Sequence, residues 1–282
     1  MKKILFSILF LFFVQSEANS KSILIKPKQL LDVRSGKMIN ADILIESGVI
    51  KEVSRNIPVL IEYEIIELPD TTILPGLMDA HVHLTGNTDL KGHEGISESS
   101  YLATIYGVKN AKQTLLSGFT TVRNVGASNY SDVALRDGIE QKAILGPTLL
   151  VSGPPLGITG GHCDSNILPA EYEYKAQGVA DGPWEVRRKV RENKKYGVDL
   201  IKYCATGGVM SKGTNVNNRQ YTLDEMKAIV DEAHTLGMKV AAHAHGLDGI
   251  RMAIDAGVDS VEHSSLIDQE TVNLAISNNV FL

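Results

Sequence analysis

The chain has 282 residues, of which 43% are hydrophobic, so it is long enough to bury a substantial core in one large domain or two smaller ones. Its formal net charge is −5 and it has no long basic run, which argues against nucleic acid or an anionic membrane surface as the main partner.

Residues 1–20 have the pattern of a secretory signal peptide. Two lysines precede an apolar run over residues 4–14, and small-x-small sites follow in residues 16–20. Because this run is too short to cross a bilayer, we expect a cleaved leader, with an uncleaved N-terminal anchor as the alternative. The pattern predicts a secreted protein of the bacterial periplasm with no stable membrane insertion after cleavage.

Residues 21–73 read as a small β-domain that resembles a sandwich. Short apolar runs at 23–25, 41–45, 49–50 and 61–68 are separated by turn residues rich in Ser and Gly. Short runs separated by such turns are typical of strands.

From residue 74 onward, strand-like runs alternate with helical stretches, which indicates βα units and a parallel sheet. Strands are expected at 74–84, 120–126, 148–153, 200–208, 240–246 and 260–265. Helices are expected at 99–116, 131–143, 184–196, 247–256 and 269–277, and one more begins with a capping box at 222–225 and ends at Gly237. Because each strand ends in polar or Gly-rich sequence, the pattern favours a (β/α)8-type barrel over a doubly wound sheet.

The predicted barrel is incomplete, with about six to seven strands. A seventh strand begins near Val280, where the sequence stops, whereas a closed barrel needs eight. We therefore predict an α/β fold in three parts: a signal peptide over 1–20, a small β-domain over 21–73 and an incomplete barrel over 74–282.

The first barrel strand carries His81 and His83, which are two residues apart and so share one side of the strand. Two imidazoles on one rigid element suit a divalent metal ion. A strand with two exposed or hydrogen-bonded histidines is the alternative if this motif is taken alone.

Further candidates fall at equivalent places on later strands. His243 ends the fifth strand, His263 lies in the sixth and Lys202 lies in the fourth, which favours a metal site at the strand ends. Burial lowers the pKa of a lysine, and a neutral amine can add carbon dioxide to form an anionic carbamate. A snorkelling or ion-paired lysine is the alternative. Arg123, near the end of the second strand, is expected to be an ion-paired structural residue.

This set resembles the amidohydrolase superfamily of metal-dependent hydrolases. Its motifs are similar to the imidazolonepropionase-related branch, and within it most similar to Xaa-Pro dipeptidase (prolidase-like) members. The stretches that carry the resemblance are 74–84, 118–126, 160–164, 204–209 and 242–246.

The resemblance implies one metal ion on His81 and His83, a second on His243 and His263, and a carboxylated Lys202 that bridges them. Zinc is the expected ion. The family also has an aspartate after the eighth strand that acts as the proton-transfer base. The sequence ends before that position, and Asp79 is not assigned the role.

The implied reaction is cleavage of an amide or peptide bond, as in an Xaa-Pro dipeptide, by a metal-activated hydroxide. Two alternatives stay open: an amidohydrolase that acts on a cyclic amide or lactone, and a catalytically silent truncated fragment. The expected partner is a small molecule or dipeptide, and a homo-oligomer is left open.

Four residues are weaker candidates. His162, in a Gly-rich loop, is a candidate to bind substrate or to stabilise an oxyanion, or it holds the loop backbone. His245 shares the parity of His243 and either binds substrate or packs. Arg219 and Tyr221 follow the fourth strand and could bind a substrate carboxylate, or they belong to a solvated loop.

The chain has two cysteines, Cys163 and Cys204. Two cysteines do not form a disulfide framework, so we expect free thiols near a pocket. A single bridge between them stays open.

Overall fold

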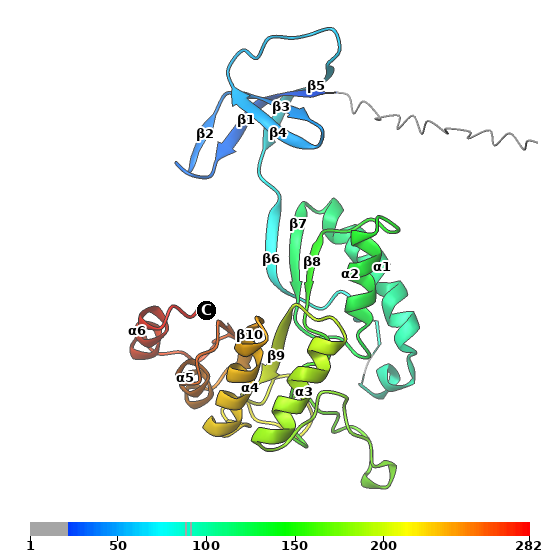
Figure 1. Ribbon diagram of the computed structural model, residues 1–282, viewed down its shortest axis with the longest axis vertical. Coiled ribbons are helices and arrows are strands. Elements are labelled where there is room, and N and C mark those ends of the chain that lie inside the picture. Colours follow the sequence, from blue (N-terminus) through cyan, green and yellow to red (C-terminus); the bar gives the residue numbers. More distant parts are fainter. Residues whose placement is uncertain (1–21, 88, 91) are drawn as a thin grey trace, which may run out of the picture. The chain divides into compact units, whose positions relative to one another are not determined.

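A computed structural model describes residues 22–87, 89–90 and 92–282 (Figure 1). The predicted signal peptide lies outside the described residues. The chain divides into two compact units at the junction of Pro75 and Gly76, and each unit is described by itself. Within the described part of the chain, no helix combines the length and the apolar character needed to span a bilayer.

The first unit is built on one five-stranded sheet. Its strands are β1 (Ile23–Asp32), β2 (Lys37–Ile39), β3 (Asp42–Glu46), β4 (Val49–Ser54) and β5 (Glu64–Ile73). The strand order is β2-β1-β3-β4 with antiparallel pairing, and β5 pairs with β1 in parallel. The side chains of Leu24, Leu44 and Ile57 form a small buried cluster, which gives this sheet an apolar core of its own.

The second unit consists of parallel βα units, as the alternation predicts. Its strands are β6 (Leu77–Val82), β7 (Phe119–Asn124), β8 (Thr148–Val151), β9 (Leu200–Cys204), β10 (Lys239–Ala244) and β11 (Ser260–His263). They form two parallel three-stranded ladders, β6-β7-β8 and β9-β10-β11. Backbone hydrogen bonds connect the ladders between β8 and β9, including Asp199 N to Val151 O at 2.8 Å. Phe281 bridges to Ser260 in parallel, where the sequence predicts the next strand.

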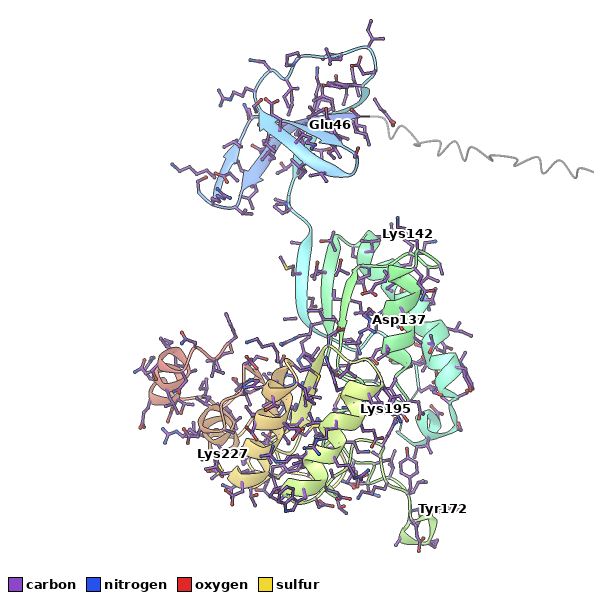
Figure 2. The ribbon with its side chains drawn as sticks, in the orientation of Figure 1. Glu46, Asp137, Lys142, Tyr172, Lys195 and Lys227 are labelled. Atoms are coloured by element: carbon purple, nitrogen blue, oxygen red, sulfur yellow. A yellow bond between two sulfur atoms is a disulfide. The ribbon has the colours of Figure 1, made fainter. Side chains whose placement is uncertain are left out.

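Among the described residues, six α-helices accompany these strands, and Figure 1 shows how they are arranged. They are α1 (Ser100–Leu116), α2 (Ser131–Glu140), α3 (Pro183–Lys195), α4 (Leu223–Thr235), α5 (Leu247–Asp255) and α6 (Gln269–Ser277), with short 3₁₀ turns η1 (Gly92–Ser97) and η2 (Ala170–Tyr172). The outer faces of α3 and α4 carry exposed charged residues such as Lys195 and Lys227 (Figure 2). This arrangement is a partial (β/α) barrel, which confirms the predicted fold class.

The helix and strand ends differ from the predicted ones by a few residues, for local reasons. The helix α2 stops at Glu140 rather than near 143, and Lys142 has a left-handed φ of 60°. The predicted capping box of α4 is confirmed, because Thr222 Oγ1 accepts from Glu225 N and Thr222 N donates to Glu225 Oε2. Two backbone donors at the start of α4 therefore have side-chain acceptors.

Candidate active site

Four histidines from three strands meet at one place. His81 belongs to β6, His83 follows it, His243 belongs to β10, and His263 ends β11. The ring centroids of His81 and His263 are 4.7 Å apart, those of His243 and His263 are 4.8 Å apart, and those of His81 and His83 are 5.4 Å apart. The structure thus brings together the four histidines that the sequence singles out.

His263 reaches this cluster through its backbone. Glu262 and Ser260 hydrogen-bond to each other, so they share one side of β11 and simple alternation would place His263 on the other side. His263 has a φ of 73°, in the left-handed region that ends the extended strand. This turn places its ring against those of His81 and His243.

Lys202 lies in β9 and is buried, with 3% of its surface exposed. Burial lowers the pKa of its amine to about 8, with an opposing effect of the Glu262 charge and a smaller lowering by Arg123. A lowered pKa makes the neutral amine accessible near physiological pH. Lys202 lines the same cavity as the histidines.

Three of these histidines, His83, His243 and His263, are held as neutral imidazoles. Burial, together with the neighbouring charges of His162, His81 and Lys202, lowers the pKa of His243 to about 2 and that of His263 to about 4. Burial also lowers the pKa of His83. The neutral imidazole is the form that binds metal ions, so the side chains present fit a divalent cation.

The hydrogen bonds of the rings orient them and leave one nitrogen of each ring for a ligand. His81 donates from Nδ1 to Glu262 Oε2 at 2.8 Å, and His83 donates from Nδ1 to Gly126 O at 3.2 Å. His243 donates from Nε2 to Gly207 O at 3.3 Å. Each remaining nitrogen keeps a lone pair for coordination, which is the arrangement typical of metal-ligating histidines. The ligand atoms of His243, His245 and His263 also lie within 4.8 Å of one another.

A glycine permits the contact of His83. A Cβ on Gly126 would lie 3.0 Å from the His83 ring, and Gly126 has a φ of 157°. Any larger residue at 126 would therefore push against the ring that its carbonyl orients.

Sequence reasoning missed Glu262, which is 7% exposed and lies at the centre of a buried network. Arg123 Nη2 donates to Glu262 Oε1 at 2.6 Å and Ser260 Oγ donates to the same oxygen at 2.7 Å, while His81 donates to the other oxygen. Burial raises the pKa of Glu262, but these hydrogen bonds and the charges of Lys202 and Arg123 outweigh it and lower the pKa to about 2. The ion pair expected for Arg123 is confirmed. A carboxylate inside an apolar strand beside His263 was the available signal.

Two of the weaker candidates lie at the cavity. His162 lies 4.3 Å from His243 between ring centroids, and its Nδ1 hydrogen-bonds to Ser211 Oγ at 2.9 Å. His245 Nδ1 hydrogen-bonds to Ser265 Oγ at 2.9 Å, and its ring stacks on His263. Both histidines line the cavity with the four discussed above.

The other two weaker candidates lie elsewhere. Tyr221 is fully buried in the hydrophobic core, and its hydroxyl donates to Ala180 O at 3.1 Å. Arg219 forms an ion pair with Asp248 at 3.2 Å. Neither residue lines the cavity, because Tyr221 faces the core and Arg219 turns toward α5.

The expectation of free thiols is wrong. Cys163 and Cys204 form a disulfide, with their Cα atoms 6.0 Å apart. The bridge joins the loop that carries His162 to the end of β9, two residues after Lys202, because the fold brings these segments to the same wall of the cavity. The sequence spacing of 41 residues does not reveal this proximity.

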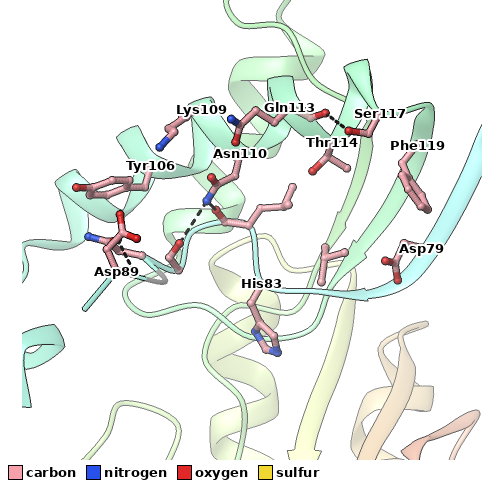
Figure 3. A pocket seen from close by; sticks show the side chains of 14 residues that line it. Asp79, His83, Asp89, Tyr106, Lys109, Asn110, Gln113, Thr114, Ser117 and Phe119 are labelled. Atoms are coloured by element: carbon pink, nitrogen blue, oxygen red, sulfur yellow. Dashed lines mark hydrogen bonds between the residues drawn. The ribbon is translucent and has the colours of Figure 1, made fainter. Parts of the chain in front are cut away.

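The cavity has a volume of about 920 Å³, a size typical of small-molecule sites. His83 also borders a second, smaller cavity of about 390 Å³ beside α1 (Figure 3). There Asn110 donates to Leu84 O at 2.7 Å and so ties the segment after β6 to α1, while the His83 ring points away from that helix. Asp79 Oδ1 accepts from His81 N at 2.9 Å and stiffens the end of β6.

The parallel βα units form a partial (β/α) barrel. Its histidine-lined cavity lies at the strand ends, where barrels of this type carry their active sites. The amidohydrolase family pattern matches residues 72–282, and the chain belongs to that family.

Two curated relatives and one solved structure illustrate the similarity. The ochratoxinase of Aspergillus niger is 35% identical over 221 residues, which are 72% of this chain and 45% of the relative. The imidazolonepropionase of Fusobacterium nucleatum subsp. nucleatum is 24% identical over 281 residues, which are 86% of this chain and 62% of the relative. The crystal structure of an Xaa-Pro dipeptidase with bound methionine in the active site superposes with a TM-score of 0.85 at 35% identity, over 93% of this chain and 66% of that chain. The chain thus spans about half of the ochratoxinase. These similarities confirm the resemblance read from the motifs.

Proposed function

We propose that the protein is a metal-dependent hydrolase that cleaves an amide or peptide bond, with an Xaa-Pro dipeptide as the first substrate class. The observation that carries this proposal is the convergence of four imidazoles and one buried amine on a cavity of about 920 Å³. Membership in the amidohydrolase family and the similarity to an Xaa-Pro dipeptidase and an ochratoxinase support it.

His81 and His83 would hold one divalent cation, His243 and His263 a second, and a carboxylated Lys202 would bridge them, with zinc as the expected metal. Such ions supply an activated hydroxide and polarise the scissile carbonyl. Glu262 would fix the His81 ring through its hydrogen bond to Nδ1.

His162 is assigned a role in stabilising charge on the substrate. Burial, with the charges of His245 and Lys202, lowers its pKa, so the ring is neutral at pH 7. In the tautomer whose Nδ1 accepts from the Ser211 hydroxyl, the Nε2–H group would donate to the oxygen that becomes negative when the carbonyl is attacked.

The test is metal analysis combined with a dipeptide-library assay on the full-length mature protein. We expect stoichiometric zinc, and loss of both zinc and turnover in His83→Ala and Lys202→Ala. His234→Ala is the matched control, because His234 is exposed on α4 and pairs with Asp259 away from the cavity. Unchanged turnover in either site variant would discard the assignment.

A second candidate is hydrolysis of a cyclic amide, which the similarity to an imidazolonepropionase favours. Assays of cyclic amides beside linear dipeptides separate the two, because the ring-opening enzyme would leave the linear peptides intact.

Export to the periplasm and the domain limits at residues 20 and 73 belong to the same proposal. N-terminal sequencing of the protein recovered from the periplasm tests the cleavage after residue 20.

A further inference from the structure

Glu98 has a carboxylate oxygen with no partner in the described part of the chain. It lies between η1 and α1 and lines the same cavity as the histidines. Its Oε1 atom is buried and receives no hydrogen bond. A buried carboxylate oxygen without a donor is costly, and such a group in a native structure calls for a ligand or another explanation.

Capping of α1 does not explain this carboxylate. Ser99 occupies the N-cap position of that helix, and its Oγ accepts from Tyr101 N at 3.3 Å. Tyr101 N, one of the free backbone donors at this helix start, therefore has the serine hydroxyl as its acceptor, and Glu98 Oε1 accepts from none of them.

Asp164 is another carboxylate at the cavity, and backbone N–H groups of the surrounding loop hydrogen-bond to both of its oxygens. Its Oδ1 accepts from Ser165 N at 2.8 Å and Ala176 N at 2.9 Å, and its Oδ2 accepts from Gly160 N at 2.9 Å. Asp164 is therefore a structural residue of the loop. Of these two carboxylates, Glu98 is the one with an oxygen left to receive a hydrogen-bond donor from a bound molecule.

We propose that Glu98 selects substrates that carry a cationic amino group on the acyl side of the scissile bond. The inference rests on the proposed amide hydrolysis and specifies its substrate class. An ammonium group would give the buried oxygen a charge-assisted hydrogen bond, which a neutral group of the same size cannot match. The ammonium has two sources in a dipeptide, the free α-amino terminus or a lysine side chain.

Matched peptide pairs distinguish these sources in the metal-loaded, full-length protein. Norleucyl-proline against N-acetyl-norleucyl-proline tests the α-amino group, and lysyl-proline against norleucyl-proline tests the side chain. We expect the wild type to favour the cationic member of one pair by about 10- to 100-fold in kcat/KM, the range of a hydrogen bond to a charged group. In Glu98→Gln this ratio should fall toward one.

Two further variants keep the experiment decisive. Glu171→Gln removes a carboxylate from the exposed turn η2 and should leave the ratio as in the wild type. Where the lysyl-proline pair is the one that discriminates, Glu98→Lys should reverse the preference, so that glutamyl-proline is cleaved faster than glutaminyl-proline. If Glu98→Gln slows both members of each pair equally, Glu98 has a structural role and the inference is wrong. A wild type that discriminates in neither pair also overturns it.

Failure of the proposed hydrolysis is recognised separately. If no peptide is cleaved, the assignment to peptide hydrolysis fails, and calorimetric titration of the same peptides decides the question of Glu98. Tighter binding of the cationic member to the wild type, lost in Glu98→Gln, would support the inference without any turnover. Equal affinities would overturn it.

Discussion

The Cys163–Cys204 disulfide is expected to be a major contributor to the stability of the barrel unit. It closes a segment of 41 residues that contains η2, α3 and β9. Removing the bridge in Cys163→Ala/Cys204→Ala restores conformational freedom to the unfolded chain. Chain-entropy arguments assign about 3 kcal/mol to a 15-residue loop and about 4.7 kcal/mol to a 100-residue loop, so about 4 kcal/mol is expected here.

The assay is urea denaturation of the oxidised wild type and of the double variant, followed by circular dichroism. The variant should lose about 4 kcal/mol of unfolding free energy. Its m-value should rise, because an unfolded chain without the cross-link exposes more surface. Treatment with dithiothreitol should bring the wild type to the same stability and should leave the double variant unchanged.

Two results would refute this reasoning. Intact-mass analysis of the oxidised protein after thiol alkylation would refute the bridge itself if two alkyl groups were added. Equal unfolding free energies of the oxidised wild type and the double variant would show that the bridge does not constrain the unfolded chain.

Three further perturbations test the buried charges and a helix cap. Glu262→Gln should lower the unfolding free energy of the metal-free protein by about 3 kcal/mol at pH 7, because Arg123 loses its buried partner. The pKa of Glu262 is lowered from 4.5 to about 2, so the contribution of its carboxylate to the unfolding free energy should be complete above pH 4.5 and be lost as the pH drops toward 2. Denaturation curves at a series of pH values should show less of this loss in Glu262→Gln. Lys202→Met should stabilise the metal-free protein by up to about 3 kcal/mol below pH 8, because it removes a buried amine whose pKa is lowered from 10.5 to about 8. Urea denaturation curves should show this gain in unfolding free energy disappearing as the pH approaches 10.5. Thr222→Ala should cost about 1 kcal/mol in thermal unfolding through the lost cap of α4, whereas Thr222→Ser should keep it; equal losses would argue against the cap.

Local patterns in the sequence were enough to predict the βα alternation and the place of four histidines. Strand and helix periods depend on residues a few positions apart, so short windows contain that information. The strand ends of a parallel sheet share one edge, and this rule is sufficient to expect His81 and His243 near each other. The capping box of α4 was readable for the same reason, since its two partners are three residues apart.

Tertiary structure alone decided the surroundings of these residues. The hydrogen bond between His81 and Glu262 joins positions 181 residues apart, and no local period indicates it. The disulfide likewise depends on two segments folding against the same cavity wall.

The side that a residue faces also depended on the fold at two positions. Tyr221 follows a polar loop in sequence, yet it lies in the hydrophobic core, where its ring packs near that of Tyr203. His263 reaches the histidine cluster through a left-handed backbone turn that strand alternation does not predict. Sequence therefore determined which chemical groups stand at the strand ends, because that depends on local periodicity. The fold decided which partners orient them and which buried groups are left for a ligand, because those contacts join residues far apart in the chain.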